Sequence, residues 1–154
     1  MEIEEHSLDD FFDKNIQPLI TEYSKLSLNT PEQSVTDYTS LTKENLRQVY
    51  KQTYKEADIS FILATDDNNP VGFSIIEYSM QTHLNFKTAN INSLFISKDY
   101  RKLGNGKQLL NKTFEVAKQH GAKGFYLIAP VGSRLESVFN RLFVKTDSLF
   151  FKEL

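Results

Sequence analysis

The sequence has no cysteine, and this absence excludes disulfide bonds, thiolate metal sites and a cysteine nucleophile together. It also has no long apolar run, since no stretch approaches the roughly 20 residues of a membrane-spanning helix. The acidic N-terminus lacks the charge pattern of a signal peptide. We therefore expect a cytosolic protein without a membrane segment.

The sequence also lacks a large excess of either positive or negative charge. The 18 basic and 20 acidic residues give a formal net charge of only -2, and no long basic block occurs, so nucleic acid is not an expected partner. The three histidines do not combine with acidic residues at metal-ligand spacing, and we expect no metal site. With 40% hydrophobic and 25% charged residues, the chain fits one globular domain over residues 1–154.

Hydrophobic periodicity predicts the first elements. Residues 1–5 fit a short strand, and apolar residues at three- and four-residue spacing predict an amphipathic helix over 8–26. Pro18 would disrupt a helix interior but is harmless in a first turn. We therefore expect a break near Asn15, with Asn15 as the N-cap of the second half, and a further helix that starts at Thr42.

A hairpin and two helix–strand units follow. Residues 59–64 and 71–78 read as strands joined by the turn-forming run 66–70, and 88–96 reads as a third strand. The remaining predicted elements are a helix that ends at Gly121, a strand over 124–129, a helix that opens with the capping-box pair Ser133 and Glu136, and one or two strands over 143–154.

The most informative segment is Arg101-Lys102-Leu103-Gly104-Asn105-Gly106, which connects the strand-like run 91–96 to a helix-like segment. Glycine permits positive φ and lets a ligand approach the backbone closely. The first N–H groups of a helix have no partner in their own helix and point toward an anion. The segment therefore predicts phosphate binding.

Two familiar phosphate loops do not fit this segment. A P-loop requires Gly-x-x-x-x-Gly-Lys-Ser/Thr, but Gly104 and Gly106 are one residue apart and Lys107 is followed by Gln108. A dinucleotide-binding loop requires a third glycine where Leu109 stands. Nucleoside triphosphatase and dinucleotide-binding functions are therefore not indicated.

Together with Leu94-Phe95-Ile96 before it and Leu109-Leu110 after it, the pattern Arg/Gln-x-x-Gly-x-Gly/Ala resembles the GNAT superfamily of acyl-CoA-dependent N-acetyltransferases. The predicted order of elements agrees with that family over nearly the whole chain. The resemblance implies an α+β fold, with a central mixed, mostly antiparallel sheet of six to seven strands flanked by about four helices. It also implies transfer of an acetyl group from acetyl-CoA to a primary amine by direct attack in a ternary complex.

The family binds acetyl-CoA in a recurring place, which the resemblance carries to this chain. The strand before the turn has a bulge and splays from the next strand, and the pantetheine arm lies in the gap. An N–H near Phe95 or Ile96 would bind the thioester oxygen, and N–H groups of the turn would hold the pyrophosphate. The implied acetyl-CoA contacts are Leu94, Phe95, Ile96, Arg101, Lys102, Leu103, Gly104, Asn105, Gly106 and Lys107.

Several of these side chains have a second interpretation. Arg101 fits an ion pair that holds the turn as well as it fits a cofactor contact. Lys102 and Lys107 are compatible with simple exposure to solvent. Asn105 stands where the family usually has an apolar residue, although asparagine tolerates strained backbone angles.

The catalytic acid of the family is missing from its expected place. The family's last helix carries a tyrosine that protonates the departing thiolate, and Phe139 stands there in this chain. A phenyl ring has no proton to donate, so solvent, Ser133 or Tyr126 assists the thiolate, or catalysis is weak.

Candidates for the base precede the cofactor strand. Glu77 and His83 could face the substrate, although Glu77 alternates with apolar strand residues and fits a solvent-facing position, and a lone loop histidine is usually exposed. The candidate catalytic residues are thus Glu77, Tyr126 and Ser133.

The acceptor amine, a small molecule or a peptide, is not identified by any motif. Many family members form homodimers, so the resemblance allows one here. Two other functions stay open: a GNAT-like module that binds acetyl-CoA for regulation without efficient transfer, and a structural domain that binds no cofactor.

Overall fold

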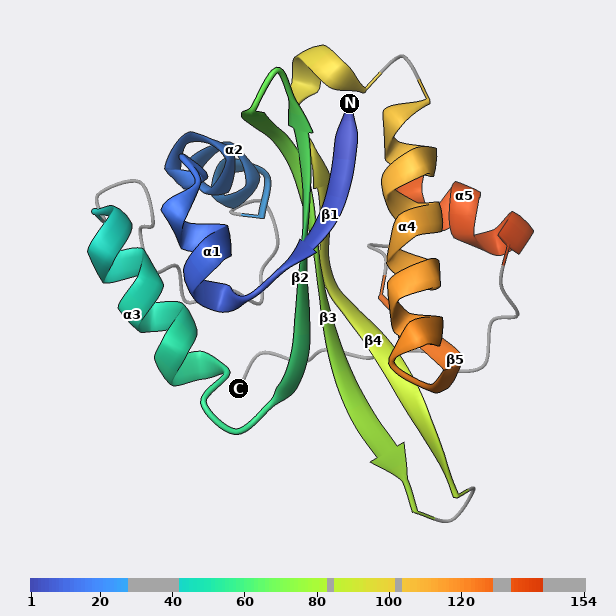
Figure 1. Ribbon diagram of the computed structural model, residues 1–154. Coiled ribbons are helices and arrows are strands. Elements are labelled where there is room, and N and C mark those ends of the chain that lie inside the picture. Colours follow the sequence, from blue (N-terminus) through green and yellow to red (C-terminus); the bar gives the residue numbers. More distant parts are fainter. Residues whose placement is uncertain (28–41, 83–84, 102–103, 129–133, 143–154) are drawn as a thin grey trace, which may run out of the picture.

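The computed structural model describes residues 1–27, 42–82, 85–101, 104–128 and 134–142. The strands of these ranges form one sheet in the order β1-β2-β3-β4-β5 (Figure 1). Neighbouring strands are antiparallel except for the parallel pair β4–β5. This confirms the expected α+β fold with a mixed, mostly antiparallel sheet. The strands are β1 (Glu2–His6), β2 (Asp58–Asp66), β3 (Asn69–Gln81), β4 (Phe86–Ile96) and β5 (Ala122–Leu127).

The helices begin where the sequence supplies caps or proline constraints. The side chain of Ser7 caps the first helix, and that of Thr42 accepts a hydrogen bond from Asn45 N at 3.2 Å, as expected for a helix that starts after it. The break predicted near Asn15 is present, and Pro18 lies in the first turn of the second helix. The helices are α1 (Leu8–Asp13), α2 (Gln17–Ser27), α3 (Lys43–Thr53), the 3-10 helix η2 (Lys98–Tyr100), α4 (Asn105–Gln119) and α5 (Arg134–Leu142).

The number of elements differs from the expectation. The described ranges contain five strands where six to seven were expected, and the strands predicted over 143–154 lie outside those ranges. They contain five α-helices where about four were expected, because the break near Asn15 divides the first predicted helix into two. No helix of the described ranges has the length and apolar character needed to cross a membrane.

The β2–β3 connection is shorter than the run 66–70 suggested. Both strands extend further, and only Asp67 and Asn68 lie between them, with φ of 46° and 64°. Positive φ at both positions is the geometry of a two-residue hairpin turn, which aspartate and asparagine tolerate.

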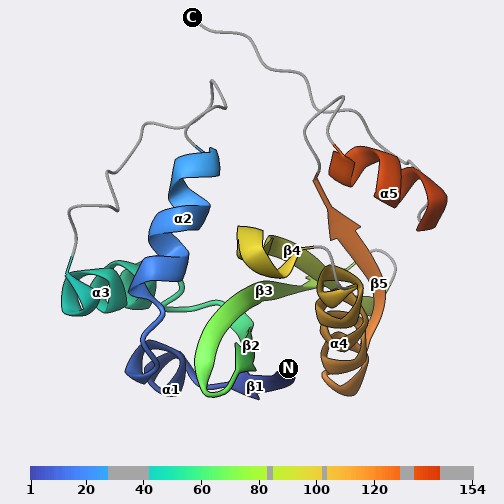
Figure 2. The ribbon, with the colours of Figure 1, turned by 90° about the horizontal axis from the view of Figure 1, so that it is seen from above.

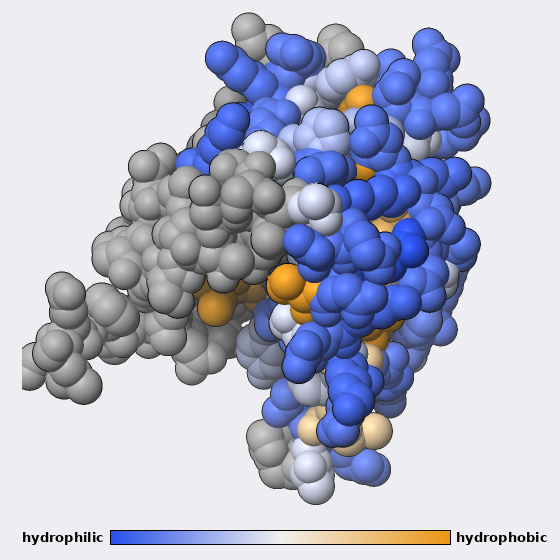
Figure 3. Space-filling view, turned by 90° about the vertical axis from the view of Figure 1, so that its left-hand side faces the viewer, coloured by the Kyte–Doolittle hydropathy of each residue, from blue (hydrophilic) through white to orange (hydrophobic). Residues whose placement is uncertain are grey.

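Alternation along the strands gives the sheet two apolar faces. One face packs the aromatic side chains of Phe61, Phe73 and Phe95 against α1, α2 and α3. The other packs Ile62, Ile76 and neighbouring residues against α4. Figure 2 shows α1–α3 on one side of the sheet and α4 and α5 on the other. Seen from the α1–α3 side, the described surface is mostly hydrophilic, as amphipathic helices require (Figure 3).

A polar network holds the C-terminal end of α4 against the sheet. His120 Nε2 lies 2.9 Å from Glu5 Oε1, and the imidazole stacks on the ring of Tyr78 at 5.1 Å. The Tyr78 hydroxyl lies 3.0 Å from Ser60 Oγ, and burial raises the pKa of this phenol. These contacts tie α4 to β1, β2 and β3, which fixes the direction in which its N-terminus points.

The β4 strand is irregular where the site forms. In the register with β3, Ile75 pairs with Ser93 and Ile76 with Ile91, so Asn92 is the extra residue of a bulge. The pairing of β4 with β5 stops at Ile91 and Leu127, and β5 turns away from the end of β4 (Figure 2). The bulge and the splayed strands implied by the family resemblance are therefore present.

Gly72 allows β3 to pass close to the end of β4. A Cβ at this position would collide with Ile96 Cδ1 and lie 2.8 Å from the Phe95 carbonyl oxygen. We expect Gly72→Ala to lower the free energy of unfolding by about 1–3 kcal/mol, because backbone cannot yield as a flexible side chain does. In Gly124→Ala, the control, the new Cβ would meet side chains at an ordinary 3.8 Å. Urea unfolding compares the variants, and equal stability of the two would contradict the predicted collision.

Candidate functional site

The glycine turn presents free backbone donors at the start of α4. Gly104 is the N-cap, in the left-handed region with φ of 76°, and the first intrahelical bond runs from Gln108 N to Gly104 O at 3.1 Å. The N–H groups of Asn105, Gly106 and Lys107 precede that bond and have no acceptor in the helix. N–H groups with this geometry, together with the helix dipole, favour an anion.

The space in front of the two glycines is open. A Cβ built on Gly104 or Gly106 would have no atom of the described residues within 4 Å. Gly104 is needed for its positive φ, whereas Gly106 has an ordinary helical backbone. Because glycine weakens a helix by about 1 kcal/mol relative to alanine, Gly106 has no evident advantage for folding. Without a side chain at Gly106, the N–H groups at this helix start stay accessible.

Asn105 closes the turn from inside. Its side chain is buried, and its amide donates a hydrogen bond to the Tyr100 carbonyl oxygen at 3.1 Å. The polar residue in place of the family's apolar one therefore has a hydrogen-bonding partner inside the turn.

Arg101 holds the end of β4. Its Nε donates to the Ile96 carbonyl oxygen at 2.8 Å, and its guanidinium lies over the Phe95 ring, 5.4 Å from the centroid. A third contact joins Nη2 to Glu22 Oε1 at 3.7 Å. The structure thus places Arg101 in the turn-holding role that was one of its two interpretations, and a phosphate contact stays a prediction.

The last residues of β4 pair on one edge only. Leu94, Phe95 and Ile96 pair with Ser74, Phe73 and Gly72 of β3. On the edge that faces β5, pairing ends at Ile91, so this part of β4 has no partner strand among the residues that the structure describes. Unpaired strand edges accept an extended chain as an additional strand.

A polar row crosses the sheet beside the bulge. In the strand registers Glu77 of β3 lies opposite Asn90 of β4, and Asn90 lies opposite Tyr126 of β5. Residues opposite each other on neighbouring strands share a face. Glu77 also pairs with Ile59, which packs against the α1–α3 core, so the row is on that face of the sheet. Glu77 is partly buried on this face and keeps part of its surface in contact with solvent.

Hydrogen bonds fix the Glu77 carboxylate. Its Oε2 accepts from Asn92 Nδ2 at 2.9 Å, and Asn92 Oδ1 accepts from Asn90 Nδ2 at 2.7 Å. Glu77 is partly buried, and the bulge brings Asn92 to the same side as Asn90. The result is a carboxylate held by amides at the position where β4 and β5 begin to separate.

Three features follow one another along β4 and the turn after it: the Glu77 carboxylate beside the bulge, the unpaired edge from Leu94 to Ile96, and the helix start at Gly104 with its unpaired N–H groups. The sequence profile of the Acetyltransferase (GNAT) family matches residues 24–137, well over half of the chain. The chain belongs to this family. The GNAT assignment made from the turn and the element order is confirmed.

Solved structures with the same GNAT fold span the whole chain. An aminoglycoside acetyltransferase from an uncultured soil metagenomic sample aligns with a TM-score of 0.75 at 16% identity, over 99% of this chain and 97% of its own. A GNAT family acetyltransferase from Staphylococcus aureus gives 0.72 at 24% identity over 100% of both chains. A ribosomal-protein-alanine N-acetyltransferase from Brucella melitensis gives 0.68 at 17% identity, over 100% and 99%. No curated protein sequence matches this chain.

The other candidate residues from the sequence lie on β5, on α5, at the start of α4 or outside the described ranges. Tyr126 is 45% exposed on β5, and Phe139, which replaces the family's tyrosine, is buried on α5. Lys107 is exposed in the first turn of α4. Lys102, Leu103, His83 and Ser133 lie outside the described residues.

Sequence reasoning missed Asn90 and Asn92. They lack a motif, and only the strand register and the bulge bring them to Glu77. The sequence signal was confined to the two asparagines on either side of Ile91 in the strand.

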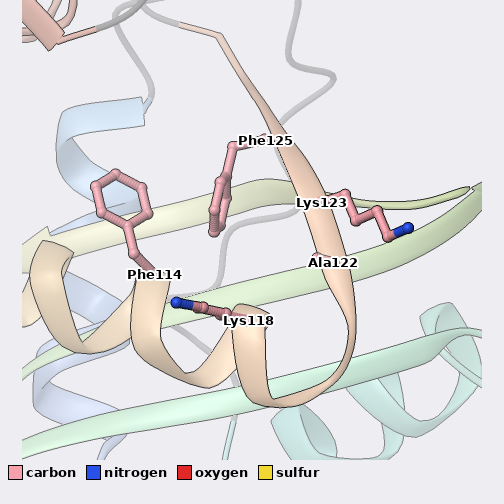
Figure 4. A pocket seen from close by; sticks show the side chains of 5 residues that line it. All are labelled: Phe114, Lys118, Ala122, Lys123 and Phe125. Atoms are coloured by element: carbon pink, nitrogen blue, oxygen red, sulfur yellow. The ribbon is translucent and has the colours of Figure 1, made fainter.

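A separate apolar groove lies between α4 and β5, with a volume of about 550 Å³ (Figure 4). It is on the α4 face, so the sheet separates it from the row of Glu77 and Tyr126. No carboxylate or backbone turn enters its lining, which consists of Phe114, Lys118, Ala122, Lys123 and Phe125.

Proposed function

We propose that this GNAT protein is an N-acetyltransferase that transfers the acetyl group of acetyl-CoA to a primary amine by direct attack in a ternary complex. The observation that carries the proposal is the meeting of the open glycine turn with the unpaired end of β4. A diphosphate and an extended pantetheine arm need these two features side by side.

The donor side fits acetyl-CoA through the main chain. The N–H groups of Asn105, Gly106 and Lys107 would hold the pyrophosphate, and the exposed Lys107 adds positive charge. The free edge of Leu94, Phe95 and Ile96 would pair with the pantetheine arm. An N–H near Phe95 or Ile96 would stabilise negative charge that develops on the thioester oxygen. Acetyl-CoA supplies the activated acetyl group.

The acceptor side fits an amine. A substrate ammonium must lose a proton before its nitrogen can attack, and Glu77 would accept that proton, directly or through a water. Asn92 and Asn90 hold the carboxylate in place. As the new C–N bond forms and the C–S bond breaks, the thiolate takes a proton from Tyr126, which lies in the same row, or from solvent. The nitrogen releases its second proton to solvent, and a deprotonated Tyr126 regains its proton from solvent. Ser133 stays a further proposed donor from the sequence alone.

The acceptor is proposed as a class, a small-molecule or peptide primary amine. The similar structures include an aminoglycoside acetyltransferase and a ribosomal-protein-alanine N-acetyltransferase, so the shared fold serves different amines. A carboxylate beside the splayed strands favours a cationic acceptor, since it both attracts an ammonium and accepts its proton.

One observation favours a second candidate function. The ring of Phe139 is buried and carries no hydroxyl at the family's acid position. This second function is that of a regulatory module that binds acetyl-CoA without efficient transfer.

Calorimetry and a thiol-release assay separate the candidates. We expect acetyl-CoA to bind, and free thiol to appear only when a suitable amine from a panel of aminoglycosides, polyamines, lysine and N-terminal peptides is added. Binding without turnover on any amine would favour the module. Absence of acetyl-CoA binding would contradict both functions.

A further inference from the structure

The carboxylate of Glu22 on α2 contacts three residues of the connection between β4 and α4. Its Oε2 accepts from Ser97 Oγ at 2.8 Å, and its Oε1 accepts from Lys98 N at 2.9 Å. The same Oε1 lies 3.7 Å from Nη2 of Arg101. A residue from the N-terminal part of the chain thus binds the segment that leads to the glycine turn.

The contact with Lys98 replaces a missing helix cap. Ser97 is the N-cap of η2, but its side chain makes no capping bond, and its hydroxyl donates to Glu22. The N–H of Lys98, the first of the short helix, would otherwise have no acceptor in that helix. The Glu22 carboxylate satisfies this N–H and neutralises Arg101 at once, which an apolar residue cannot do.

The other anchors of the connection come from the sheet and from the connection itself. Ser97 N donates to Val71 O at 2.9 Å, Tyr100 N donates to Ser97 O at 3.0 Å, and Asn105 reaches back to Tyr100 O. Glu22 ties this segment to the α1–α3 layer, which covers the sheet face that carries Glu77.

The next residue of α2 reaches the other part of the site. The Tyr23 ring packs edgewise on Phe73 and Phe95, at centroid distances of 5.4 and 5.6 Å, and its hydroxyl accepts a hydrogen bond from Ser93 Oγ at 3.2 Å. Ser93 directly follows the bulge residue Asn92. One turn of α2 therefore contacts both the segment that leads to the glycine turn and the sheet face that carries Glu77.

We propose that Glu22 is a positioning residue that couples α2 to the glycine turn. It fixes residues 97–101 so that the N–H groups of Asn105, Gly106 and Lys107 are oriented before the ligand arrives, which lowers the ordering cost of binding. Conversely, occupancy of the turn stabilises α2 through the same carboxylate, since such coupling is reciprocal. This inference rests on the proposed binding of acetyl-CoA at the turn.

The test uses Glu22→Ala, Glu22→Gln and a charge-matched control, Glu4→Ala, which removes an exposed carboxylate from the opposite edge of the sheet. Calorimetry gives the Kd for acetyl-CoA, and amide hydrogen exchange with and without acetyl-CoA reports on α2. Loss of hydrogen bonds to a charged group predicts a Kd about 10-fold higher in Glu22→Ala and a smaller rise in Glu22→Gln, which keeps one acceptor. Glu4→Ala should match the wild type.

Hydrogen exchange distinguishes coupling from a general loss of structure. Acetyl-CoA should slow exchange in residues 17–27 of the wild type. This protection should vanish in Glu22→Ala and be reduced in Glu22→Gln, while protection at the start of α4 persists under saturation. If Glu22→Ala does not fold, Glu22→Gln decides. Wild-type affinity and wild-type protection of α2 in the Glu22 variants would overturn the inference. A wild-type protein that does not bind acetyl-CoA would instead overturn the proposed function.

Discussion

Gly106→Glu is expected to weaken acetyl-CoA binding by about 100-fold or more while leaving the fold at least as stable as the wild type. A carboxylate at this position would lie against the pyrophosphate, and two like charges about 4 Å apart at a protein surface repel by roughly 4 kcal/mol before screening. Calorimetry with acetyl-CoA measures the loss.

The stability of the same variant should move in the opposite direction. Gly106 has a helical backbone and open space around its Cβ position, so a side chain meets no obstacle. Glutamate is a better helix former than glycine by roughly 0.5–1 kcal/mol, and a negative charge near a helix N-terminus adds about 0.3–1 kcal/mol. Urea unfolding should therefore show equal or higher stability.

Gly106→Gln is the matched control, because it has the same shape without the charge. We expect it to bind acetyl-CoA more weakly than the wild type and more tightly than Gly106→Glu. Wild-type affinity in Gly106→Glu would place the phosphate-binding site elsewhere.

Glu77→Gln is expected to lower kcat by about 10²- to 10⁴-fold, the usual effect of removing a general base. The acetyl-CoA affinity should be unchanged, because Glu77 lies in the polar row on the α1–α3 face and not at the glycine turn. The fold should also be retained, since the glutamine oxygen can still accept the bond from Asn92. Steady-state kinetics with saturating acetyl-CoA measures kcat.

A second carboxylate variant tests whether the effect is specific to Glu77. Glu4→Gln, on the outer strand β1, should keep the wild-type kcat. A Glu77→Gln enzyme with more than half of the wild-type kcat would exclude Glu77 as the base.

The local features of the site could be predicted from the sequence. Gly104 adopts the positive φ that glycine permits, and α4 begins at Asn105 as the pattern indicated. The break near Asn15 follows from the chemistry of proline. Each of these depends on neighbours in the chain, which a sequence displays directly.

The features that depend on contacts between separate strands and helices could not be predicted. Glu77 and Tyr126 belong to separate strands, and their common row through Asn90 depends on a strand register that bulges shift by whole residues. β5 itself occupies Ala122–Leu127, two residues earlier than the predicted 124–129. The contact of Glu22 with Lys98 joins positions 76 residues apart and depends on how α2 packs on the sheet.

The most direct test of the central claim is a two-dimensional NMR titration of the protein with acetyl-CoA. The central claim is that the end of β4 and the start of α4 form one acetyl-CoA site. It predicts the largest amide shifts at Phe95, Ile96, Gly104, Asn105, Gly106 and Lys107, with little change at Phe114, Lys118 and Phe125 of the α4–β5 groove. Shifts concentrated at the groove, or none at millimolar acetyl-CoA, would contradict the claim.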